Sequence, residues 1–319
     1  MLRAIICSDL HLEFYDNDKC PFLKKLLKPP SDNVKPDNVK CDTLIIAGDF
    51  GYPFNKKNAV NQIFVSVLTK LKLRFEHIVY VSGNHEYYQT LERNRSIEET
   101  DKSIRDICDK IGIHFLQKDS WIHPSGVRFI GCTLWSDIGP EACKDMNDFQ
   151  KVFESKYEYN ALHQDHKDWL ERQILVSEQT NPIIVVTHHL PSFKGIAPHY
   201  KDATNNSAYA SNLDYLFDGP VIGWAGGHVH YPQSVQINGR FLHINPIGYK
   251  GEKIQHPRQD DPFVFIFDKF KAKQIKEQRN DLNYSLIDNL NNEQNNNPVS
   301  GLSLEQVEPA STSVASFDV

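Results

Sequence analysis

The sequence predicts an α/β fold in which two β-sheets pack face to face and helices cover their outer sides. In the first hundred residues, short apolar runs typical of strands alternate with segments whose apolar residues recur at the three- and four-residue spacing of helices. Such strand–helix–strand units form right-handed parallel crossovers. The second half of the chain is richer in strand-like runs, which provides the strands of a second sheet.

Strands are predicted where strongly apolar runs stand between polar or turn-forming residues. The first half of the chain contains these runs: Ala4–Cys7, Leu44–Ala47 and Ile78–Val81. The second half contains these: Val127–Leu134, Ile183–Thr187, Val221–Gly226, Arg240–Asn245 and Phe263–Phe267.

Helices that cover a sheet are predicted where one face of a segment is apolar. The spacing indicates these segments: Lys57–Leu73, Ser96–Gly112 and Ala161–Ser177. On the last of them, these residues form the face expected to be buried: Trp169, Leu170, Ile174 and Leu175. His163 and His166 lie on the same helix, and we expect surface or hydrogen-bonded core histidines there rather than metal ligands.

Two segments depart from this pattern. Residues 20–41 are rich in proline, which interrupts helices and central strands, so a surface insertion is predicted, with an amphipathic turn or two at Phe22–Lys28. From residue 269 the chain becomes rich in Asn and poor in periodic apolar residues. We therefore predict one folded domain over residues 1–268 and a disordered tail over residues 269–319.

The composition is typical of a soluble cytoplasmic enzyme. The chain has 319 residues, of which 40% are hydrophobic and 24% charged. It lacks the run of ~18 apolar residues that a membrane span needs, and its first strand begins too early to leave a cleavable signal peptide. Its six cysteines include no Cys-x-x-Cys pair and are expected to be buried thiols.

The net charge of −6 lacks the basic character of a dedicated nucleic-acid binder. It does not exclude a phosphate substrate, because divalent cations would reverse the potential locally.

Five short polar motifs follow the predicted strands. In chain order they are Asp9-Leu10-His11, Gly48-Asp49, Gly83-Asn84-His85-Glu86, His188-His189 and Gly227-His228-Val229-His230. Side chains at the ends of neighbouring strands converge on one edge of a sheet, and carboxylates, imidazoles and an Asn amide suit hard to borderline divalent metals. A lone Gly-Asp after a strand is usually a turn, but all five motifs together predict a site for two metal ions.

This order of motifs resembles the calcineurin-like metallophosphoesterase superfamily from Ile5 to about Phe267. Further strings resemble its small stand-alone members from microbes and viruses: Ser8–Phe14, Gly83–Tyr88, Thr133–Trp135, Met146–Phe149, Thr187–His189 and Asn245–Tyr249. Two positions depart from the pattern, since that branch usually has Arg at Ile247 and many relatives have an acidic residue or Asn at Tyr52. The resemblance implies a four-layer α/β/β/α sandwich with two mixed β-sheets.

The resemblance also implies a ligand set. The first metal takes Asp9, His11, Asp49 and His230. The second takes Asp49, Asn84, His188 and His228, so that Asp49 bridges the two ions. His85 matches a histidine that does not ligate but faces the substrate, where it protonates the leaving oxygen or stabilises the charge at phosphorus.

Two neighbours of these ligands have supporting roles in this interpretation. The family pattern favours His188 over His189 as the ligand, so His189 would lie at the rim of the site or support a ligand. Glu86 is expected to accept a hydrogen bond from the outer nitrogen of a ligating imidazole.

The implied activity is hydrolysis of a small phosphomonoester or phosphodiester by a hydroxide that bridges two divalent transition metals. Mn, Fe, Zn, Ni and Co all accept these ligands. Several polar residues are candidates either for the substrate pocket or for ordinary packing: Tyr52, Tyr88, Asn147, Asp148 and Tyr200.

Two alternatives remain. A nuclease acting on nucleic-acid ends would need a Lys/Arg cluster that the sequence does not show. A non-catalytic scaffold would be expected to have lost ligands, or His85, which are all present here.

Overall fold

A computed structural model describes residues 2–27, 41–88, 95–139, 146–176, 181–254 and 264–267. The chain divides into two compact units, residues 1–276 and 277–319. The second unit and the whole predicted tail from residue 269 lie outside the described residues, so the fold below is that of the first unit.

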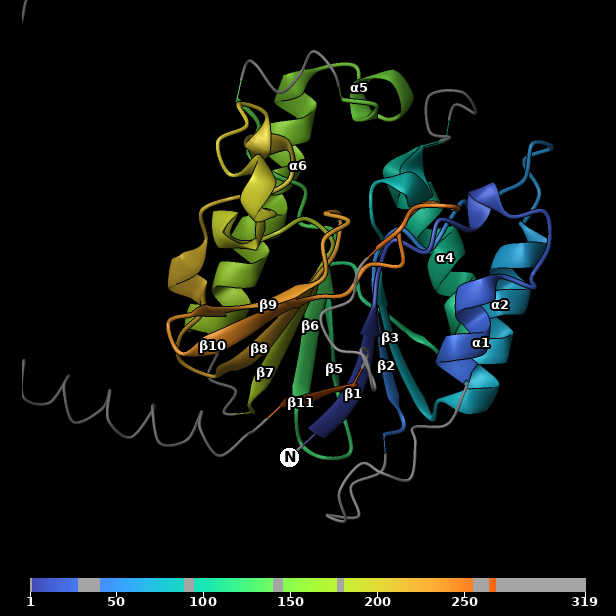
Figure 1. Cartoon of the computed structure of the whole chain (residues 1–319), viewed down its shortest axis with the longest axis horizontal. Coiled ribbons are helices and arrows are strands. Elements are labelled where there is room, and N and C mark those ends of the chain that lie inside the picture. The colour runs from blue at the N-terminus through green and yellow to red at the C-terminus, as the bar shows by residue number, and fades with distance from the viewer. Residues whose placement is uncertain are drawn as a thin grey trace, which may run out of the picture. The chain divides into compact units, whose positions relative to one another are not determined.

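Two β-sheets form the centre of this unit (Figure 1). The first sheet has the order β11 (Val264–Phe267), β1 (Leu2–Cys7), β2 (Thr43–Ala47), β3 (His77–Val81) and β4 (His114–Phe115). The second has the order β5 (Asp119–Ile122), β6 (Arg128–Cys132), β7 (Ile183–Thr187), β8 (Val221–Gly226), β10 (Arg240–Ile244) and β9 (Gln233–Ile237). Within each sheet the inner strands are parallel, and the antiparallel pairs are β1 with β11, β5 with β6, and β9 with β10.

The alternation of side chains along β1 separates two cores. Ile6 belongs to a buried cluster that joins the sheets and includes Val79 and Val186, whereas its neighbour Ile5 belongs to a cluster shared with the helices. Successive side chains of a strand point to opposite faces of the sheet, so one apolar strand serves both cores. This explains why the inner strands read as continuous apolar runs.

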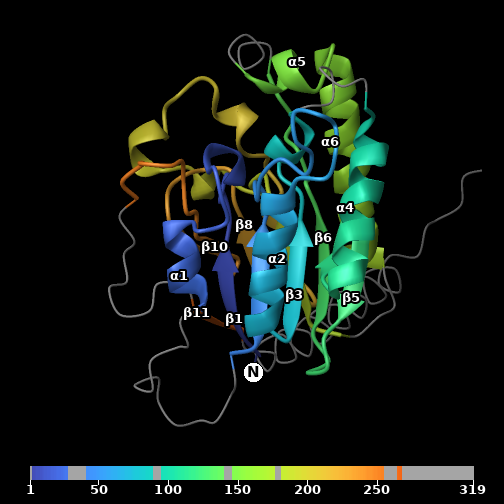
Figure 2. The same ribbon diagram turned by 90° about the vertical axis from the view of Figure 1, so that its right-hand side faces the viewer.

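Helices cover the outer faces of both sheets (Figures 1 and 2). The first sheet is covered by α1 (Pro21–Leu27), α2 (Gln62–Arg74) and α4 (Ile97–Ile111). The second is covered by α6 (Lys156–Glu171), which continues as a π-helical segment over Arg172–Val176 and is preceded by the short α5 (Asp148–Lys151). The α/β fold with two mixed sheets and outer helices is confirmed.

Two predicted helix boundaries differ from the structure. Helix α2 begins at Gln62 rather than at Lys57, because the Asn61 side chain accepts a hydrogen bond from the Ile63 N–H and caps the helix there. Helix α6 begins five residues earlier than predicted, at Lys156.

The predicted buried face of α6 is wrong at Leu175, which is 51% exposed. From Arg172 the chain is π-helical, with more residues per turn than an α-helix, so residues at α-helical spacing no longer share a face. Leu170 and Ile174 are buried as expected.

Part of the predicted surface insertion belongs to the core. Helix α1 buries Phe22, Leu23 and Leu26 against the outer face of the first sheet. Residues 28–40 of that segment lie outside the described residues.

Three strands escaped prediction: β4, β5 and β9. Strand β4 has two residues, and β5 and β9 are half-exposed at most positions, so none carries a strong apolar run.

The described cysteines are free thiols, and Cys7, Cys20, Cys108 and Cys132 are buried, as predicted. Cys143 lies outside the described residues. Within the described ranges, no helix combines the length and apolar character that a membrane crossing requires.

Candidate metal centre

The predicted ligands all lie in loops that follow the inner strands. Asp9 and His11 follow β1, while Asp49 follows β2. The others follow β3, β7 and β8: Asn84, His188, His228 and His230. The structure brings six of the seven into groups with metal-like spacing, namely Asp9–His11–His230, His11–Asp49–His85 and Asp49–His188–His228. Asn84, the seventh, lies beside His188.

The ligand loops adopt unusual backbone conformations. Asp9, His11, Asp49 and His228 have φ values of 55°, 49°, 51° and 68°. Left-handed backbone is uncommon for residues other than glycine, and such strain concentrates at functional sites.

Glycines in the same motifs are required by close packing. A Cβ atom on Gly83 would lie 2.1 Å from Asp49 Oδ1, and one on Gly48 would lie 2.4 Å from His188 Nδ1. A Cβ on Gly227 would lie 2.5 Å from a backbone oxygen and 2.9 Å from the same His188 nitrogen. The glycines therefore allow the ligand loops to approach one another.

The first group is organised by two outer carboxylates. His11 Nδ1 lies 3.1 Å from Glu13 Oε1, and His230 Nδ1 lies 2.7 Å from Glu252 Oε2. If both Nδ1 atoms donate to these carboxylates, the two Nε2 atoms carry lone pairs, yet they lie 3.2 Å apart and near Asp9. Converging lone pairs of this kind require a shared proton or a cation.

The group of Asp49, His188 and His228 converges in the same way. His188 Nδ1 donates to the Ala47 carbonyl at 2.9 Å, so its Nε2 lone pair is directed inward. That atom lies 3.1 Å from Asn84 Oδ1 and 3.3 Å from Asp49 Oδ1. The Asn84 amide is oriented because its Nδ2 donates to the Tyr88 hydroxyl at 2.8 Å, which leaves the oxygen facing His188.

Asp49 lies between the two groups. Its Oδ1 is 3.3 Å from His188 Nε2, and its Oδ2 is 3.8 Å from His11 Nε2. The two oxygens of one carboxylate thus face different groups, which is the arrangement that a bridging ligand needs.

The acidic and histidine side chains of the site shift one another's pKa values. Burial lowers the pKa of His188, but the carboxylates of Asp49 and Asp9 outweigh burial and raise it to about 9. Burial likewise lowers the pKa of His230, which Asp9 and Glu252 nevertheless raise to about 9. Burial raises the pKa of Asp49, yet His188 holds it well below its usual value. Ligands of this kind bind a divalent cation by releasing such protons.

The residues present fit a metal centre. Asp9 Oδ2 is buried and has no hydrogen-bond partner in the described structure. A buried carboxylate oxygen without a partner carries a large desolvation penalty that coordination to a cation removes. Together with the inward-facing Nε2 atoms of His11, His188 and His230, this oxygen favours cation binding.

His85, which forms a group with His11 and Asp49, is 6% exposed. Its Nδ1 is 2.7 Å from Glu13 Oε1, its Nε2 is 3.9 Å from Asp49 Oδ2, and its ring stacks on Tyr88 with centroids 4.1 Å apart. Burial lowers the pKa of His85, but Asp49 and Glu13 raise it to about 9.

Glu86 supports the ligands as expected, but through their backbone and not through an imidazole. Its carboxylate accepts hydrogen bonds from the backbone N–H groups of Asp49, Phe50 and Gly83 and from the Tyr80 hydroxyl, so it ties two ligand loops together.

The acceptor for an outer imidazole nitrogen is instead Glu13, which faces both His11 and His85. Glu252 does the same for His230. Sequence reasoning missed both carboxylates as site residues.

His189 is fully buried, so a position at the rim of the site is wrong. Its ring packs on His228 with centroids 4.1 Å apart, and its Nε2 lies 3.3 Å from the Tyr159 hydroxyl. Burial holds the pKa of His189 well below its usual value. It therefore supports His228 as a neutral side chain. His163 and His166 are buried core residues that bond the Leu134 carbonyl and N–H.

Two adjoining cavities open at the site, of about 140 and 480 Å³. Of the residues considered as substrate contacts, Tyr88, Asn147 and Asp148 line the smaller cavity and Tyr200 lines the larger. Tyr52 lines neither, although its ring lies 6.4 Å from that of His85.

Other lining residues were not anticipated. Asn205, Tyr209 and Tyr249 border both cavities, as do the predicted ligands His228 and His230. Tyr249 stands in one of the strings that carried the family resemblance, whereas Asn205 and Tyr209 lie in an irregular loop between β7 and β8 that has no recognisable pattern.

Known proteins resemble this chain in sequence and in fold. An uncharacterised protein of Acanthamoeba polyphaga mimivirus is 29% identical over 303 residues, which cover 89% of this chain and 98% of that protein. A solved structure described as phosphopantetheinyl hydrolase from Mycobacterium tuberculosis has 16% identity and a TM-score of 0.56, covering 77% of this chain and 89% of that one. At that identity the likeness shows the fold alone.

The family comparison is decisive because it spans the site. The model of the calcineurin-like phosphoesterase family matches residues 2–232, a range that includes both groups of predicted ligands and His85. The chain belongs to the calcineurin-like phosphoesterase family.

Proposed function

We propose that this protein is a metal-dependent phosphoesterase that hydrolyses a phosphomonoester or phosphodiester at a centre of two divalent transition-metal ions. The observation that carries the proposal is that the predicted ligands converge on both oxygens of Asp49, with Oδ1 facing His188 and Oδ2 facing His11. His85, which Glu13 holds beside Asp49, adds further support.

In this proposal every ligand is one of the converging side chains. The first metal is held by Asp9, His11, Asp49 and His230. The second is held by Asp49, Asn84, His188 and His228. Two bound cations would lower the pKa of a water molecule and neutralise charge in the in-line transition state.

The residues around the ligands keep them in the required form. Glu13 and Glu252 accept from the Nδ1 atoms of His11 and His230, and the Ala47 carbonyl accepts from His188. Each imidazole then offers Nε2 to a cation, because the acceptor fixes the tautomer.

His85 is the proposed proton donor to the leaving oxygen. Glu13 holds its Nδ1, and its Nε2 is directed to the side where Asp49 and the smaller cavity lie. That cavity, of about 140 Å³, is lined by Asp49, Asn84 and His85, and it is the proposed place of the phosphate group.

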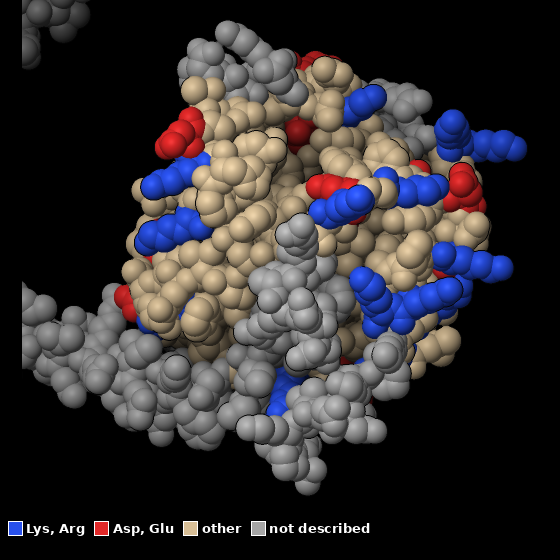
Figure 3. Space-filling model, viewed as in Figure 1, with Lys and Arg blue, Asp and Glu red and all other residues tan. Residues whose placement is uncertain are grey.

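The structure offers no support for the nuclease alternative. Among the described residues that line the two cavities there is neither Lys nor Arg, and a nucleic-acid backbone would need such contacts. On the face in Figure 3, Lys and Arg side chains gather over α1 instead. A small phosphate ester is therefore the proposed substrate.

The test is turnover of a panel of phosphomonoesters and phosphodiesters by chelator-stripped protein to which Mn, Fe, Zn, Ni or Co is added singly. We expect activity to depend on added metal and elemental analysis to approach two ions per chain. Protein that binds no metal and hydrolyses none of the esters would contradict the proposal and favour the scaffold alternative.

A further inference from the structure

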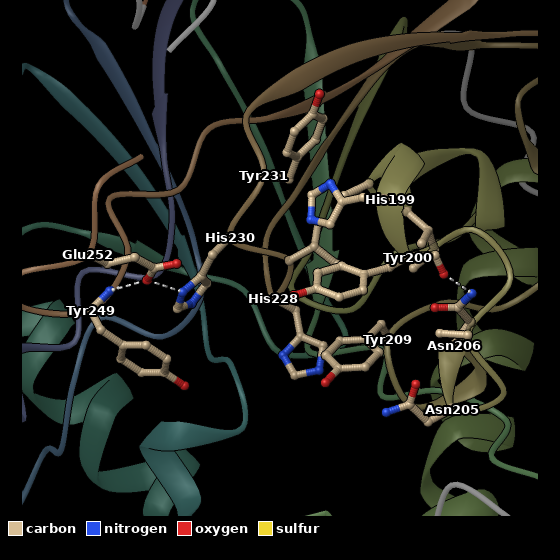
Figure 4. Close-up of a pocket in the computed structure, with 14 residues that line it drawn as sticks. His199, Tyr200, Asn205, Asn206, Tyr209, His228, His230, Tyr231, Tyr249 and Glu252 are labelled. Atoms are coloured by element: carbon tan, nitrogen blue, oxygen red, sulfur yellow. Dashed lines mark hydrogen bonds and ion pairs between the residues drawn. The ribbon is translucent and has the colours of Figure 1, made fainter. Parts of the chain in front are cut away.

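The larger cavity beside the candidate metal centre is lined mainly by residues that do not belong to the predicted ligand set. It lies between residues 196–209, 228–231 and 249–252, has a volume of about 480 Å³, and is called the side pocket below (Figure 4). Ligand sites usually occupy ~300–1,000 Å³. In the proposed function the phosphate group binds in the smaller cavity. The side pocket would then hold the organic group of the ester.

The side pocket continues directly from the phosphate position. His228 and His230 border both cavities, and Asn205, Tyr209 and Tyr249 form their common wall. An organic group joined through oxygen to phosphorus in the smaller cavity would therefore extend into the side pocket.

Aromatic rings form much of the wall. Tyr209 lies 5.0 Å from the ring of His228 at an interplanar angle of 34°, and His199 lies between Tyr200 at 4.3 Å and Tyr231 at 5.8 Å. In Figure 4 these rings form a column on one side of the open space, with His230, Tyr249 and Glu252 on the other. Walls of this kind favour a flat ring as ligand, because aromatic faces and edges attract one another.

The described lining of the side pocket holds a single carboxylate, Glu252, which pairs with His230 at 2.7 Å. The described lining residues include no Lys or Arg, and the carboxylate of Glu252 already accepts from His230 and from the Tyr249 N–H. The amides of Asn205 and Asn206 lie at one end (Figure 4). Asn206 Nδ2 donates to two backbone carbonyls, which fixes the plane of its amide. Amides and hydroxyls recognise the polar edges of an uncharged ring.

A second surface cavity shows the contrast. It lies on the α1 side of Tyr249, has a volume of about 500 Å³, and is lined by Lys19, Lys25 and Lys250. Additional phosphate groups of a substrate could pair with these lysines, whereas the described lining of the side pocket has no Lys or Arg.

We propose that the side pocket binds an uncharged planar heterocycle with polar edges, so that the substrates are phosphate esters of nucleosides rather than of simple alcohols or polyanions. This inference rests on the proposed function. It assigns the specificity to the rings and amides of residues 199–209, with Tyr200 and Asn205 in reach of the bound group.

The first experiment compares matched esters on the metal-loaded full chain. Adenosine 5′-phosphate is compared with glycerol phosphate and fructose bisphosphate as monoesters. Thymidine 5′-(p-nitrophenyl phosphate) is compared with methyl p-nitrophenyl phosphate as diesters. Stacking of one base strengthens binding about 10-fold or more. In whichever class of ester the enzyme hydrolyses, kcat/KM for the nucleoside ester should therefore exceed that for the matched ester without a base by at least about 10-fold.

The second experiment changes the wall. Tyr200 is 61% exposed, so Tyr200→Leu should not unfold the chain. We expect it to lower the preference for the nucleoside ester about 10-fold and to weaken the binding of adenosine alone, measured by calorimetry, by a similar factor. Tyr157→Leu is the matched control, because Tyr157 is 83% exposed on α6 and lines none of the three described cavities.

A third variant adds the missing charge. Asn205→Lys places a cation in the side pocket. Because an ion pair between this lysine and a second phosphate group would be stronger than in bulk water, the ratio of kcat/KM values should shift from adenosine 5′-phosphate toward fructose bisphosphate by about 10-fold or more.

The outcomes separate the two proposals. Hydrolysis of both members of a pair at equal kcat/KM, unchanged by Tyr200→Leu, would overturn this inference and leave the proposed function standing. A preference of the unmodified protein for fructose bisphosphate would also overturn it, in favour of the lysine-lined cavity. Failure to hydrolyse any ester with any metal would overturn the proposed function and this inference with it.

Discussion

Asp49 is the residue on which the two ligand groups meet, since its two oxygens face His188 and His11. Mutation of a residue that only orients a metal ligand by a hydrogen bond lowers metal affinity or activity about 10- to 100-fold. Loss of the shared ligand should therefore cost more than about 100-fold. We predict that Asp49→Ala loses both ions and nearly all turnover, whereas Asp9→Ala loses one ion preferentially.

Elemental analysis together with kcat/KM measures the difference between these two variants. Asp119→Ala is a suitable control, because Asp119 is far more exposed and pairs with Arg105 outside the site. An Asp49→Ala protein with two ions and full turnover would exclude a bridging role.

His85 tests whether the site is catalytic. A positioned general acid is worth ~10²–10⁴ in rate, so His85→Ala should lower kcat by that range for alkyl phosphate esters. The loss should be smaller for nitrophenyl esters, whose leaving group departs without protonation. Metal content should remain nearly unchanged, because the ligand groups also contain Asp9, His188 and His230.

Kinetics with the two kinds of ester distinguish the possible roles of His85. An equal loss for both would instead indicate stabilisation of charge at phosphorus. Full activity of His85→Ala with both would remove the residue from the mechanism.

The sequence predicted which single residues lie together where each follows a strand, although their roles as ligands remain a prediction. The motif residues His188 and His228 lie together because a strand precedes each of them. Glu13 stands in the string Ser8–Phe14, two residues from its partner His11, but its contact with His85, 72 residues away, is one that no local pattern reports. Glu86 attracted attention by standing inside a motif, although its carboxylate serves the backbone.

At the scale of elements, helix α6 connects to the second sheet through a buried histidine. His166 Nδ1 accepts a hydrogen bond from the Leu134 N–H at 3.1 Å, a role that only an unprotonated nitrogen can perform. Burial, followed by the charge of Lys118, lowers the pKa of His166 to about 3. Its neutral form thus contributes stability above the ordinary histidine pKa of about 6.5.

That contribution should be lost as the pH falls from about 6.5 toward 3, because the unfolded chain binds the proton more readily than the folded one. We predict that His166→Gln is less stable than the parent at pH 7 but loses less stability on acidification to pH 4. Denaturant unfolding at both pH values measures this, with the exposed His199→Gln as control. Parallel pH profiles for His166→Gln and the parent would contradict the assignment.

Elements were predictable in proportion to the strength of their apolar pattern. Strands β7 and β8 have the predicted bounds because both are strongly apolar runs in the centre of a sheet. Strand β9 alternates between half-buried and exposed positions and contains Gln and Ser, so it looks like a loop. The π-helical end of α6 depends on tertiary packing that a period of 3.6 residues does not encode.

At the scale of the whole molecule, the domain and the Asn-rich tail can be separated experimentally. The compact unit that holds the site ends at residue 276, and the segment after it lacks the apolar residues to form a core. We predict that a chain ending at Lys276 keeps its melting temperature within about 2 °C and its kcat within about twofold. Thermal unfolding and steady-state kinetics of both chains test this, and a large loss would show that the tail docks on the domain.

The pairing of the two sheets could not be predicted from periodicity, because apolar strands buried on both faces do not reveal their neighbours. The four-layer arrangement came from the resemblance to a known family. The walls of the side pocket were equally hidden, since residues 196–209 form an irregular loop whose position depends on the rest of the fold.

The left-handed backbone at Asp9, His11, Asp49 and His228 affects the lifetime of the protein as well as its chemistry. Each such residue destabilises the folded chain by about 1–3 kcal/mol, which the surrounding hydrogen bonds must offset. Bound cations stabilise the folded form by mass action. When the cell is short of metal, the protein would therefore unfold more often and meet proteases more often. The abundance of this protein would then follow the metal supply, without any dedicated sensor.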